Sequence, residues 1–353
     1  MKIASIVGAR PQFIKCAPLS RLIREKHEEI LIHTGQHYDI GMSDIFFDEL
    51  KIPKPNYNLG VGSDSHGVQT GKMLIEIEKI LLKESPDLVL VYGDTNSTLA
   101  GDIAASKLHI KTAHVEAGLR SFDRFMPEEI NRVLADHISD LLFCPTETAV
   151  LNLKKEGITK GVYNVGDVML DSLKYNIKIA EQKATILEDL NIKSKEYIVA
   201  TVHRASNTDS FENLSSITNA FCHAGVPIVF AVHPRTEKYL KQYGLWNELC
   251  KKIKVVPPLG YLEMLKLMAH AKKILTDSGG IQKEAYMLKV PCITMRENTE
   301  WVETIADGGN VLVGADYEKI TDAILNFEGV PIKGNFFGNG NAYVNICEIL
   351  GNT

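Results

Sequence analysis

Carboxylate side chains gather shortly after two short apolar runs of the chain. Asp94 and Glu116 each follow such a run within two residues, and Glu128 and Glu129 come further on, directly behind Pro127. A carboxylate that is partly buried beside a second carboxylate has a raised pKa, which suits a general base or acid. Proline and acidic residues also favour the first turn of a helix, and we expect one of the two glutamates to have that role. Asp94 and Glu116 could alternatively be solvent-exposed loop carboxylates.

The segment at residues 276–284, with the sequence TDSGGIQKE, is predicted to form the end of a strand, a tight glycine turn and the start of a helix. Such a turn exposes backbone N–H groups at a helix N-terminus, where the helix dipole also favours a pyrophosphate. Glu284 is expected one turn into the helix, where its carboxylate could accept both hydroxyls of a ribose. The alternative is a turn that only requires glycine and is capped by Asp277 or Ser278.

The usual signatures of dinucleotide, ATP and metal sites are missing from the sequence. Neither GxGxxG nor GxxxxGK[ST] occurs, which disfavours NAD and ATP but leaves a nucleotide diphosphate compatible with the glycine turn. His33 and His37 have a spacing that zinc sites use, but they flank a strand end, and no Cys or Glu completes a tetrahedral set. We therefore predict no metal and no cofactor.

Length and composition predict a globular protein of two domains. The chain has 353 residues, of which 45% are hydrophobic and 24% charged, and these are ordinary globular values. A net charge of −5 without a basic cluster makes nucleic acid a poor partner. The N-terminus resembles neither a signal peptide nor a membrane span, which favours the cytoplasm and no membrane partner. The six cysteines are scattered without a CxxC pair, and we expect buried free thiols.

Apolar runs rich in Val, Ile and Leu alternate with segments of helical periodicity, which predicts an α/β fold with doubly wound parallel sheets. A polar, helix-prone segment at 171–195 is expected to connect two domains, at residues 1–170 and 171–335. Helices are expected at 68–83 and 342–350. The predicted strands of the first series are 3–7, 30–33, 88–92, 112–115 and 141–144, and those of the second are 197–201, 227–232, 254–256, 273–275 and 291–294.

Polar residues follow nearly every predicted strand, at the sheet edge where open α/β folds bind their ligands. If the edges of the two domains face each other, they form one deep cleft. In the first half these residues are Arg10, Gln36, His37, Asp94, Glu116 and Arg120. In the second half they are His203, Arg204, His233, Asp277, Ser278 and Arg296.

At these residues the sequence resembles the UDP-N-acetylglucosamine 2-epimerase family. The similarity runs from the first predicted strand to about Gly314, through GARPQFIK, HTGQHYD, YGDTNSTLAG, HVEAGLRS, MPEEINRVLADHISDLLF, TVHR, TDSGGIQKEA and RENTEWVE, in order. The resemblance implies two Rossmann-like domains in a glycosyltransferase-B arrangement, a homodimer, and an active site in the cleft. It also implies that the last segment, 336–353, crosses back to the first domain.

The resemblance also implies roles for individual residues. Arg10 and Lys15 match basic positions near the diphosphate and the sugar, and His203 matches an active-site histidine. Asp94, Glu116 and Glu129 match acid–base carboxylates. The positions that match UDP and substrate contacts, or flank them, are Gln36, His37, Arg120, Arg132, Arg204, His233, Ser278, Gly279, Gly280, Glu284, Arg296 and Glu300.

The chemistry implied by the family avoids a difficult proton transfer. The hydrogen on carbon 2 of a 2-acetamido sugar is not acidic, so a carboxylate removes it while UDP leaves carbon 1. The resulting 2-acetamidoglucal takes UDP back with protonation from the other face, which gives the manno epimer. Arg10, His203 and the N–H groups at 278–280 would stabilise the charge that develops on UDP. The resemblance implies that the product serves the synthesis of a surface polysaccharide or another glycan.

The sequence departs from the common bacterial pattern in three places. GARPQ stands where those enzymes carry GTRPE, TEWVE stands in place of TERPE, and the segment at 38–47 differs from their site for an activating substrate molecule. GARPQFIK, TEWVE and the glycine-rich tail favour the branch that acts on UDP-2,3-diacetamido-2,3-dideoxyglucuronate. Its uronate would need a cation, for which Arg10, Arg120 and Arg204 are candidates.

Three rival functions share the fold or the UDP site. A hydrolysing epimerase would release N-acetylmannosamine and UDP, a glycosyltransferase would need an acceptor pocket or a basic membrane-facing helix, and a non-catalytic sensor would not need three carboxylates. A measurement of UDP release distinguishes these rivals. A transferase releases UDP only when an acceptor is present, a hydrolase requires only water, and a sensor releases none.

Overall fold

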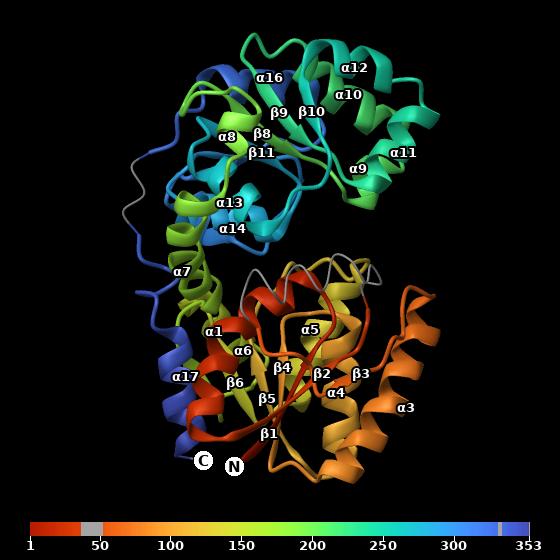
Figure 1. Ribbon diagram of the computed structural model, residues 1–353, viewed down its shortest axis with the longest axis vertical. Helices are drawn as coiled ribbons and strands as arrows, with labels where there is room; N and C mark the ends of the chain where they lie inside the picture. Colours follow the sequence, from red (N-terminus) through yellow and green to blue (C-terminus); the bar gives the residue numbers. More distant parts are fainter. Residues whose placement is uncertain (37–51, 331–333, 353) are drawn as a thin grey trace. The chain divides into compact units, whose positions relative to one another are not determined.

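The computed structural model describes residues 1–36, 52–330 and 334–352, and the chain divides into two compact units (Figure 1). The first unit comprises Met1–Lys174 and Asn335–Thr353, and the second comprises Tyr175–Gly334. Helix α7, Val168–Lys183, begins in the first unit and ends in the second. Within the described ranges, no helix combines the length and the apolar character needed to cross a bilayer.

The first unit is built on a seven-stranded parallel sheet with the order β3-β2-β1-β4-β5-β6-β7. The central strands are buried over nearly their whole length and are mostly apolar, because helices cover both faces of the sheet. The strands are β1 Lys2–Val7, β2 Glu28–His33, β3 Tyr57–Asn58, β4 Leu88–Tyr92, β5 Lys111–Val115, β6 Leu141–Cys144 and β7 Val162–Asn164. The helices are α1 Arg10–Lys26, α3 His66–Glu84, α4 Asn96–Lys107, α5 Pro127–Ile138, α6 Glu147–Lys155 and α17 Ala342–Gly351.

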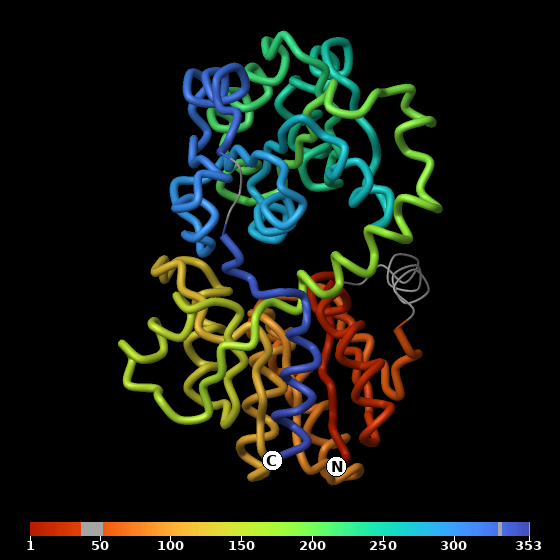
Figure 2. Tube along the Cα trace, turned by 90° about the vertical axis from the view of Figure 1, so that its left-hand side faces the viewer, coloured from red at the N-terminus to blue at the C-terminus, as the bar shows by residue number. Residues whose placement is uncertain are grey.

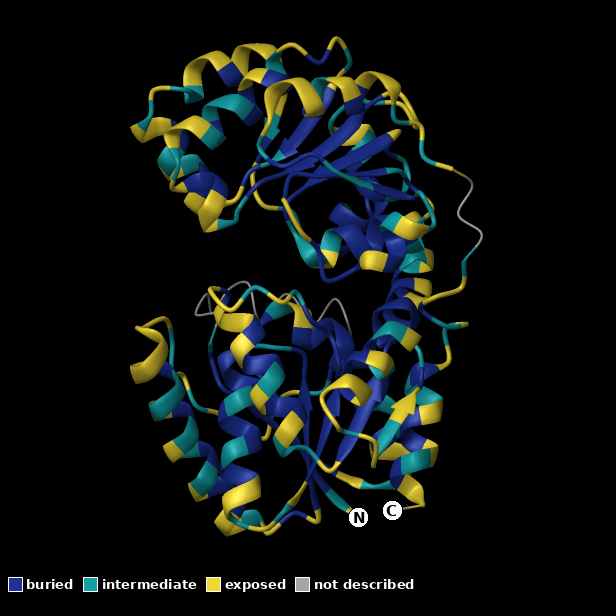
Figure 3. Cartoon of the chain, turned by 180° about the vertical axis from the view of Figure 1, so that it is seen from behind, coloured by how far each residue is buried: buried dark blue, intermediate teal, exposed yellow. Residues whose placement is uncertain are grey.

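The second unit repeats this architecture with six parallel strands in the order β10-β9-β8-β11-β12-β13. In both units the central strands are buried, and the helices carry most of the exposed residues (Figure 3). The strands are β8 Ile198–Thr201, β9 Ile228–Ala231, β10 Lys254–Val256, β11 Lys273–Thr276, β12 Cys292–Thr294 and β13 Asn310–Leu312. The helices are α8 Ile186–Asp189, α9 Ala205–Thr208, α10 Phe211–Cys222, α11 Pro234–Gln242, α12 Trp246–Lys252, α13 Tyr261–Ala269, α14 Gly279–Met287, α15 Val302–Ala306 and α16 Tyr317–Asn326.

Helix α17, the last helix of the chain, packs against α1 of the first unit. The Asp171 carboxylate accepts hydrogen bonds from the backbone N–H groups of Ala342 and Tyr343, at 3.3 and 2.8 Å, which supplies acceptors for the start of α17. The start of β1 and the end of α17 consequently lie at the same end of the first unit (Figure 2).

The predicted α/β fold class is confirmed, with all ten predicted strands present and seven of them shifted by one or two residues at one or both ends. The prediction missed β3, β7 and β13, which have two or three residues each and lie at sheet edges, where burial is incomplete. The prediction of buried thiols was wrong for Cys250, which is exposed on α12, and Cys222 is only partly buried. Both lie on helices near the surface of the unit.

Candidate active site

The carboxyl ends of β4 and β5 bring Asp94 and Glu116 to one edge of the first sheet. The two strands pair in register, with Tyr92 opposite Val115, so both chains leave the sheet at the same level. Gly93 turns the chain after β4 with a positive φ of 63°, and its N–H donates to the carbonyl oxygen of Val115 at 2.9 Å. Sequence-distant carboxylates are thus neighbours because parallel strands end together.

Arg132 of α5 links two of the three predicted acid–base carboxylates. Its Nη2 and Nε donate to Oδ2 of Asp94 at 2.7 and 3.0 Å, and its Nη1 donates to Oε2 of Glu129 at 2.9 Å. Asn131 of the same helix donates to the carbonyl oxygen of Asp94 at 2.9 Å. Helix α5 therefore fixes both the side chain and the backbone of Asp94.

Glu129 lies in the first turn of α5 and holds the preceding loop. Its carboxylate accepts hydrogen bonds from the backbone N–H groups of Ser121 and Phe122, at 2.8 and 2.9 Å, in addition to the one from Arg132. Burial by itself raises the pKa of this carboxyl, but these donors together lower it below its usual value. The expectation of a raised pKa is therefore wrong for Glu129, which is held ionised. Its neighbour Glu128 is exposed and acidifies the first turn of α5, as predicted for one of the pair.

Glu116 forms a buried ion pair with Lys15 of α1. Its backbone has a φ of +75°, a left-handed conformation that costs about 1–2 kcal/mol for a residue with a side chain. Gly93 packs directly against this pair, since a Cβ added there would lie 3.1 Å from Nζ of Lys15 and 3.3 Å from Oε2 of Glu116. A strained backbone and a paired carboxylate at a strand end are typical of an active site.

Two glutamines connect the ends of the neighbouring strands. The Gln12 side chain is buried, accepts from the N–H groups of Gly8 and Ala9, and donates to the carbonyl oxygen of Tyr92 at 2.8 Å. Gln36 accepts from the backbone N–H of Ser97 at 3.0 Å. A glutamate at position 12 would lack the donor that reaches Tyr92, which accounts for glutamine in the GARPQ motif.

The remaining predicted residues of the first unit lie at its edge, in its interior or outside the described ranges. Arg10 is the first residue of α1, directly after the end of β1. His33 ends β2, stacks on Phe13 at 5.1 Å and contacts Asn58 through Nδ1 at 3.3 Å. His37 lies outside the described residues. Among the residues that the structure describes, no group of three His, Cys, Asp or Glu side chains is arranged to hold a metal ion.

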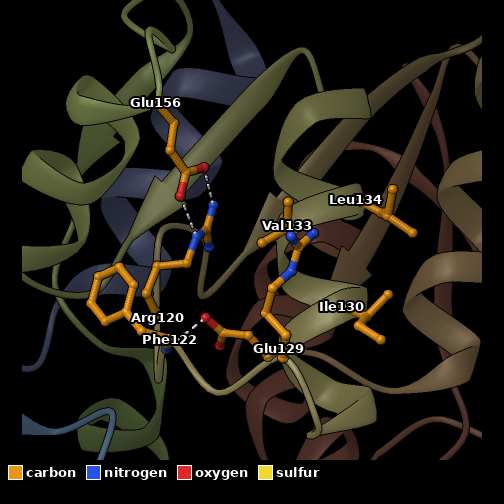
Figure 4. Close-up of a pocket in the computed structure, with 8 residues that line it drawn as sticks. Arg120, Phe122, Glu129, Ile130, Val133, Leu134 and Glu156 are labelled. Atoms are coloured by element: carbon orange, nitrogen blue, oxygen red, sulfur yellow. Dashed lines mark hydrogen bonds and ion pairs between the residues drawn. The ribbon is translucent and has the colours of Figure 1, made fainter.

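Arg120 is a buried member of an ion-pair network. Its Nη1 donates to Asp136 at 2.6 Å, and its Nε and Nη2 donate to Glu156 at 2.7 Å each. The same guanidinium lines a hollow of about 360 Å³ whose wall includes Ile130 and Val133 of α5 (Figure 4). A substrate contact by Arg120, as predicted, would have to compete with two carboxylates of the protein.

The glycine turn of the second unit joins β11 to α14 as predicted. Ser278 caps α14, with Oγ accepting from the N–H of Ile281 at 3.5 Å, and its own N–H donates to Oγ1 of Thr276 at 3.0 Å. Gly280 has open space on its side-chain side, and Glu284 lies buried one turn into the helix. The turn therefore has the small residues and the helix start that a diphosphate site requires.

Asp277 organises the ends of β8 and β11. The sequence placed it at the ligand-binding edge and as a possible cap, but indicated no role for it in orienting His203. Its buried carboxylate accepts from the backbone N–H groups of His203 and Arg204, at 3.1 and 3.0 Å, and lies 3.2 Å from Nδ1 of His203. Burial alone would raise the pKa of Asp277, but the side-chain hydrogen bond and charge of His203 and further donors lower it. An ionised carboxylate therefore holds the partly exposed imidazole of His203, whose ring lies 5.8 Å from that of His233.

Charged residues in the segment after β12 pack against the glycine turn. Arg296 pairs with Glu300 at 3.0 Å, and Gly279 packs so closely that an added Cβ would overlap Oε1 of Glu300. Trp301, one of the two residues that distinguish TEWVE from TERPE, packs its ring 4.2 Å from the ammonium of Lys283. The predicted UDP-site residues of this unit thus share one cluster around α14.

Comparison with known proteins gives one consistent result. A sequence model of the UDP-N-acetylglucosamine 2-epimerase family matches residues 21–351. A UDP-N-acetylglucosamine 2-epimerase homolog of Methanococcus maripaludis is 64% identical over 100% of both chains, and the UDP-2,3-diacetamido-2,3-dideoxy-D-glucuronate 2-epimerase of Pseudomonas aeruginosa is 49% identical over 99% of both. The structure of the Methanocaldococcus jannaschii UDP-GlcNAc 2-epimerase in complex with UDP-GlcNAc and UDP superposes with a TM-score of 0.94, at 49% identity and full coverage of both chains.

Proposed function

The chain belongs to the UDP-N-acetylglucosamine 2-epimerase family, and we propose that it is a non-hydrolysing enzyme that inverts carbon 2 of a UDP-activated 2-acetamido sugar by eliminating UDP and adding it back. The observation that carries this proposal is the linkage of Asp94 and Glu129 through Arg132, beside the Glu116–Lys15 ion pair, at one sheet edge. An elimination followed by protonation from the other face needs more than one proton-transfer group, and this edge supplies several.

The cation beside Glu129 helps to keep this carboxyl ionised, the form in which it can accept a proton. Arg132 helps to keep the pKa of Glu129 low, and Lys15 forms an ion pair with Glu116. We propose that Asp94, Glu116 and Glu129 form the acid–base group. An ion pair with Lys15 or Arg132 weakens when its carboxylate takes up a proton, and it re-forms when that proton leaves. One carboxylate takes the proton from carbon 2, and a second, protonated member of the group on the opposite face of the glycal donates a proton to carbon 2 during re-addition.

The second unit is proposed to bind UDP. The N–H groups at Ser278–Gly280 and the dipole of α14 would hold the diphosphate, and Glu284 would accept the ribose hydroxyls. His203, oriented by Asp277, would stabilise the charge of the leaving UDP, together with Arg10. His233 and the Arg296–Glu300 pair support this site from its sides.

Two candidate substrates, UDP-N-acetylglucosamine and the diacetamido glucuronate, differ in the substituents of the sugar. Relatives named for UDP-N-acetylglucosamine are 64% and 50% identical to the chain, the first of them named as a homolog, and the relative named for the diacetamido glucuronate is 49% identical. The GARPQ and TEWVE motifs favour the glucuronate, whose carboxylate needs a cation. We propose Arg10 and Arg204, which follow β1 and β8 at the edges of their sheets where such folds bind ligands, as the uronate partners.

Proton NMR in deuterated water tests the function directly. The purified protein is incubated separately with UDP-N-acetylglucosamine and with its 2,3-diacetamido glucuronate analogue. A manno product with deuterium at carbon 2 supports elimination and re-addition, and the substrate that turns over names the branch. Free N-acetylmannosamine with stoichiometric UDP would instead identify a hydrolase, and no exchange with either sugar would refute the epimerase.

A matched pair of variants tests the acid–base group in the same assay. Glu129→Gln is expected to lower the exchange rate by about 10²-fold, because general acid–base groups contribute on that order. Glu128→Gln changes the neighbouring exposed glutamate and is expected to retain wild-type exchange. Equal rates in the two variants would remove Glu129 from the group.

We also propose that the protein is a homodimer that acts in the cytoplasm for the synthesis of a glycan. Support for the dimer comes from three exposed apolar residues of α3 at seven-residue spacing, Val68, Ile75 and Leu82, which form a stripe of the kind that pairs helices. Light scattering of the wild type should give twice the mass of the chain, and Ile75→Glu should give the monomer.

A further inference from the structure

His114 of β5 is a completely buried histidine with an acceptor at each ring nitrogen. Its Nε2 lies 2.7 Å from the carbonyl oxygen of Gly93, and its Nδ1 lies 2.8 Å from Oδ1 of Asp136. A neutral imidazole has one donor and one acceptor nitrogen. Because a carbonyl oxygen can only accept, Nε2 must carry a hydrogen in this arrangement.

The second ring nitrogen faces an ionised carboxylate. Oδ2 of Asp136 accepts from the N–H of Gly118 at 3.0 Å and from Nη1 of Arg120 at 2.6 Å. Burial alone would raise the pKa of Asp136, but His114 and Arg120 together lower it, so this carboxyl remains ionised. An ionised carboxylate also only accepts, and Nδ1 of His114 must therefore carry a hydrogen as well.

The charges around His114 balance when its ring is a cation. Helix α5 contributes Asp136, the turn after β5 contributes Arg120, and Glu156 pairs with Arg120 from the end of α6. Helix α4 contributes Asp102, whose pKa burial raises to about 8, so it is protonated at neutral pH. Two cations and two anions are then paired, with His114, Arg120 and Asp136 buried and Glu156 at the surface, in accord with the rule that buried charges are paired.

The contacts of this ion pair reach each segment that carries a predicted acid–base carboxylate. His114 holds the carbonyl of Gly93, the residue before Asp94, and Asp136 holds the N–H of Gly118, two residues after Glu116. Asp136 also lies seven residues after Glu129, on the same face of α5. The β4 turn, the β5 turn and α5 are thus joined at one buried point.

We propose that His114 is a buried imidazolium that, paired with Asp136, positions Asp94 relative to Glu116 for proton transfer at carbon 2. This role rests on the proposed function, since it concerns the geometry of the same carboxylates. His114 is a positioning residue, because it acts through the Gly93 carbonyl and the protein surrounds it completely. A displacement of about 1 Å in a reacting group can lower a rate by about 10²-fold, which sets the expected size of the effect.

The protonation state is tested without any activity measurement. Nitrogen-15 NMR of the full chain labelled at histidine, between pH 6 and pH 9, reports whether each ring nitrogen carries a hydrogen. The His114 signals are identified by their loss in His114→Gln. Both nitrogens should remain protonated at pH 8, well above the value of about 6.5 at which an ordinary histidine titrates. A single protonated nitrogen at pH 7 would overturn the buried cation.

The positioning role is tested by separating exchange from binding. In His114→Gln, carbon 2 deuterium exchange should fall about 10²-fold, while the Kd for UDP from calorimetry stays within about twofold of wild type. His223→Gln changes an exposed histidine at the end of α10 and is the matched control, with exchange expected to equal wild type. Exchange within threefold of wild type in His114→Gln, or an equal loss of UDP binding, would refute the role.

A second substitution covers the case in which glutamine at 114 does not fold. Asp136→Asn keeps the size of the side chain but removes the charge, and should likewise lower exchange without weakening UDP binding. It should also let Nδ1 of His114 lose its hydrogen by pH 8 in the NMR experiment. If the wild type exchanges no deuterium with either sugar, the proposed function fails, and the NMR result alone decides whether His114 is a buried cation.

Discussion

Arg132 donates two hydrogen bonds to a single oxygen of Asp94, from Nη2 at 2.7 Å and from Nε at 3.0 Å. Its third donor group goes to Glu129, so one guanidinium orients two carboxylates on different elements. Lysine offers a point charge without this planar fork. We therefore expect different effects when the charge of Arg132 is lost and when only the planar geometry of its guanidinium is lost.

Replacing Arg132 by glutamine is expected to move the acid limb of the kcat profile to higher pH. In the wild type, Arg132 is one of the groups that lower the pKa of Glu129, so its removal raises that pKa and the carboxylate is protonated at a higher pH. Arg132→Lys keeps the charge and should keep the pH profile, with a rate lowered about tenfold by the lost fork. Profiles of carbon 2 exchange between pH 5 and pH 9 measure both, and an unmoved acid limb in Arg132→Gln would show that Glu129 does not act as the base.

Asp277→Asn is expected to lower kcat by about 10²-fold with little change in folding stability. The substitution keeps an acceptor for the N–H groups of His203 and Arg204 but removes the charge that holds the His203 ring. The exposed Asp209 pairs with Arg235, and Asp209→Asn is the control that should retain activity. Thermal unfolding and steady-state kinetics check the two variants. Equal activity in both would mean that the orientation of His203 is unimportant.

The fold was largely predictable because its central strands are continuous apolar runs. Residues 88–92 and 141–144 match β4 and β6 at both ends, since helices bury both faces of these strands and no polar position interrupts them. The short strands β3, β7 and β13 were missed because two or three half-buried residues leave no periodic signal.

The sequence predicted which residues belong to the candidate site, but it did not predict which of them form ion pairs and hydrogen bonds with each other. The position after each strand pointed to Asp94 and Glu116, but nothing local shows that Lys15 pairs with Glu116 across 101 residues. The interior partners His114 and Asp136 were overlooked because a histidine within an apolar strand is usually only a core residue. The spacing of Asp136, four residues after Arg132 and seven after Glu129, was the available signal, since it places all three on one face of α5.

The two glycines of the α14 turn are expected to respond differently to alanine. A Cβ at Gly280 meets only Ser278 Oγ, at 3.9 Å, so Gly280→Ala should leave stability unchanged but weaken UDP binding about tenfold by blocking approach to the turn. A Cβ at Gly279 would overlap Glu300, so Gly279→Ala should lower both stability and affinity. Gly71 of α3 has open space, and Gly71→Ala is the control. Calorimetry with UDP measures these effects, and wild-type affinity in Gly280→Ala would exclude the turn as the diphosphate site.

Asp102 gives a prediction for the pH dependence of stability. Burial raises the pKa of its carboxyl to about 8 in the folded protein, whereas an unfolded aspartate titrates near about 3.9. Between these values the folded state binds a proton that the unfolded state lacks, so this group makes the protein less stable as pH rises from about 4 to 8. Asp102→Asn removes that dependence and keeps an acceptor for Ser139, which contacts Asp102 at 3.4 Å.

The stability gained in Asp102→Asn should therefore be larger at pH 8 than at pH 5. Each pKa unit corresponds to about 1.4 kcal/mol, and we expect the gain to grow by about 1–4 kcal/mol over this range. Urea unfolding at both pH values measures it, with Asp322→Asn on the exposed side of α16 as a control that should show no such change. A gain that is equal at pH 5 and pH 8 would mean that Asp102 is already ionised in the folded protein. His114 would then lie near two anions, Asp136 and Asp102, and the charges around the buried ion pair would no longer balance as described.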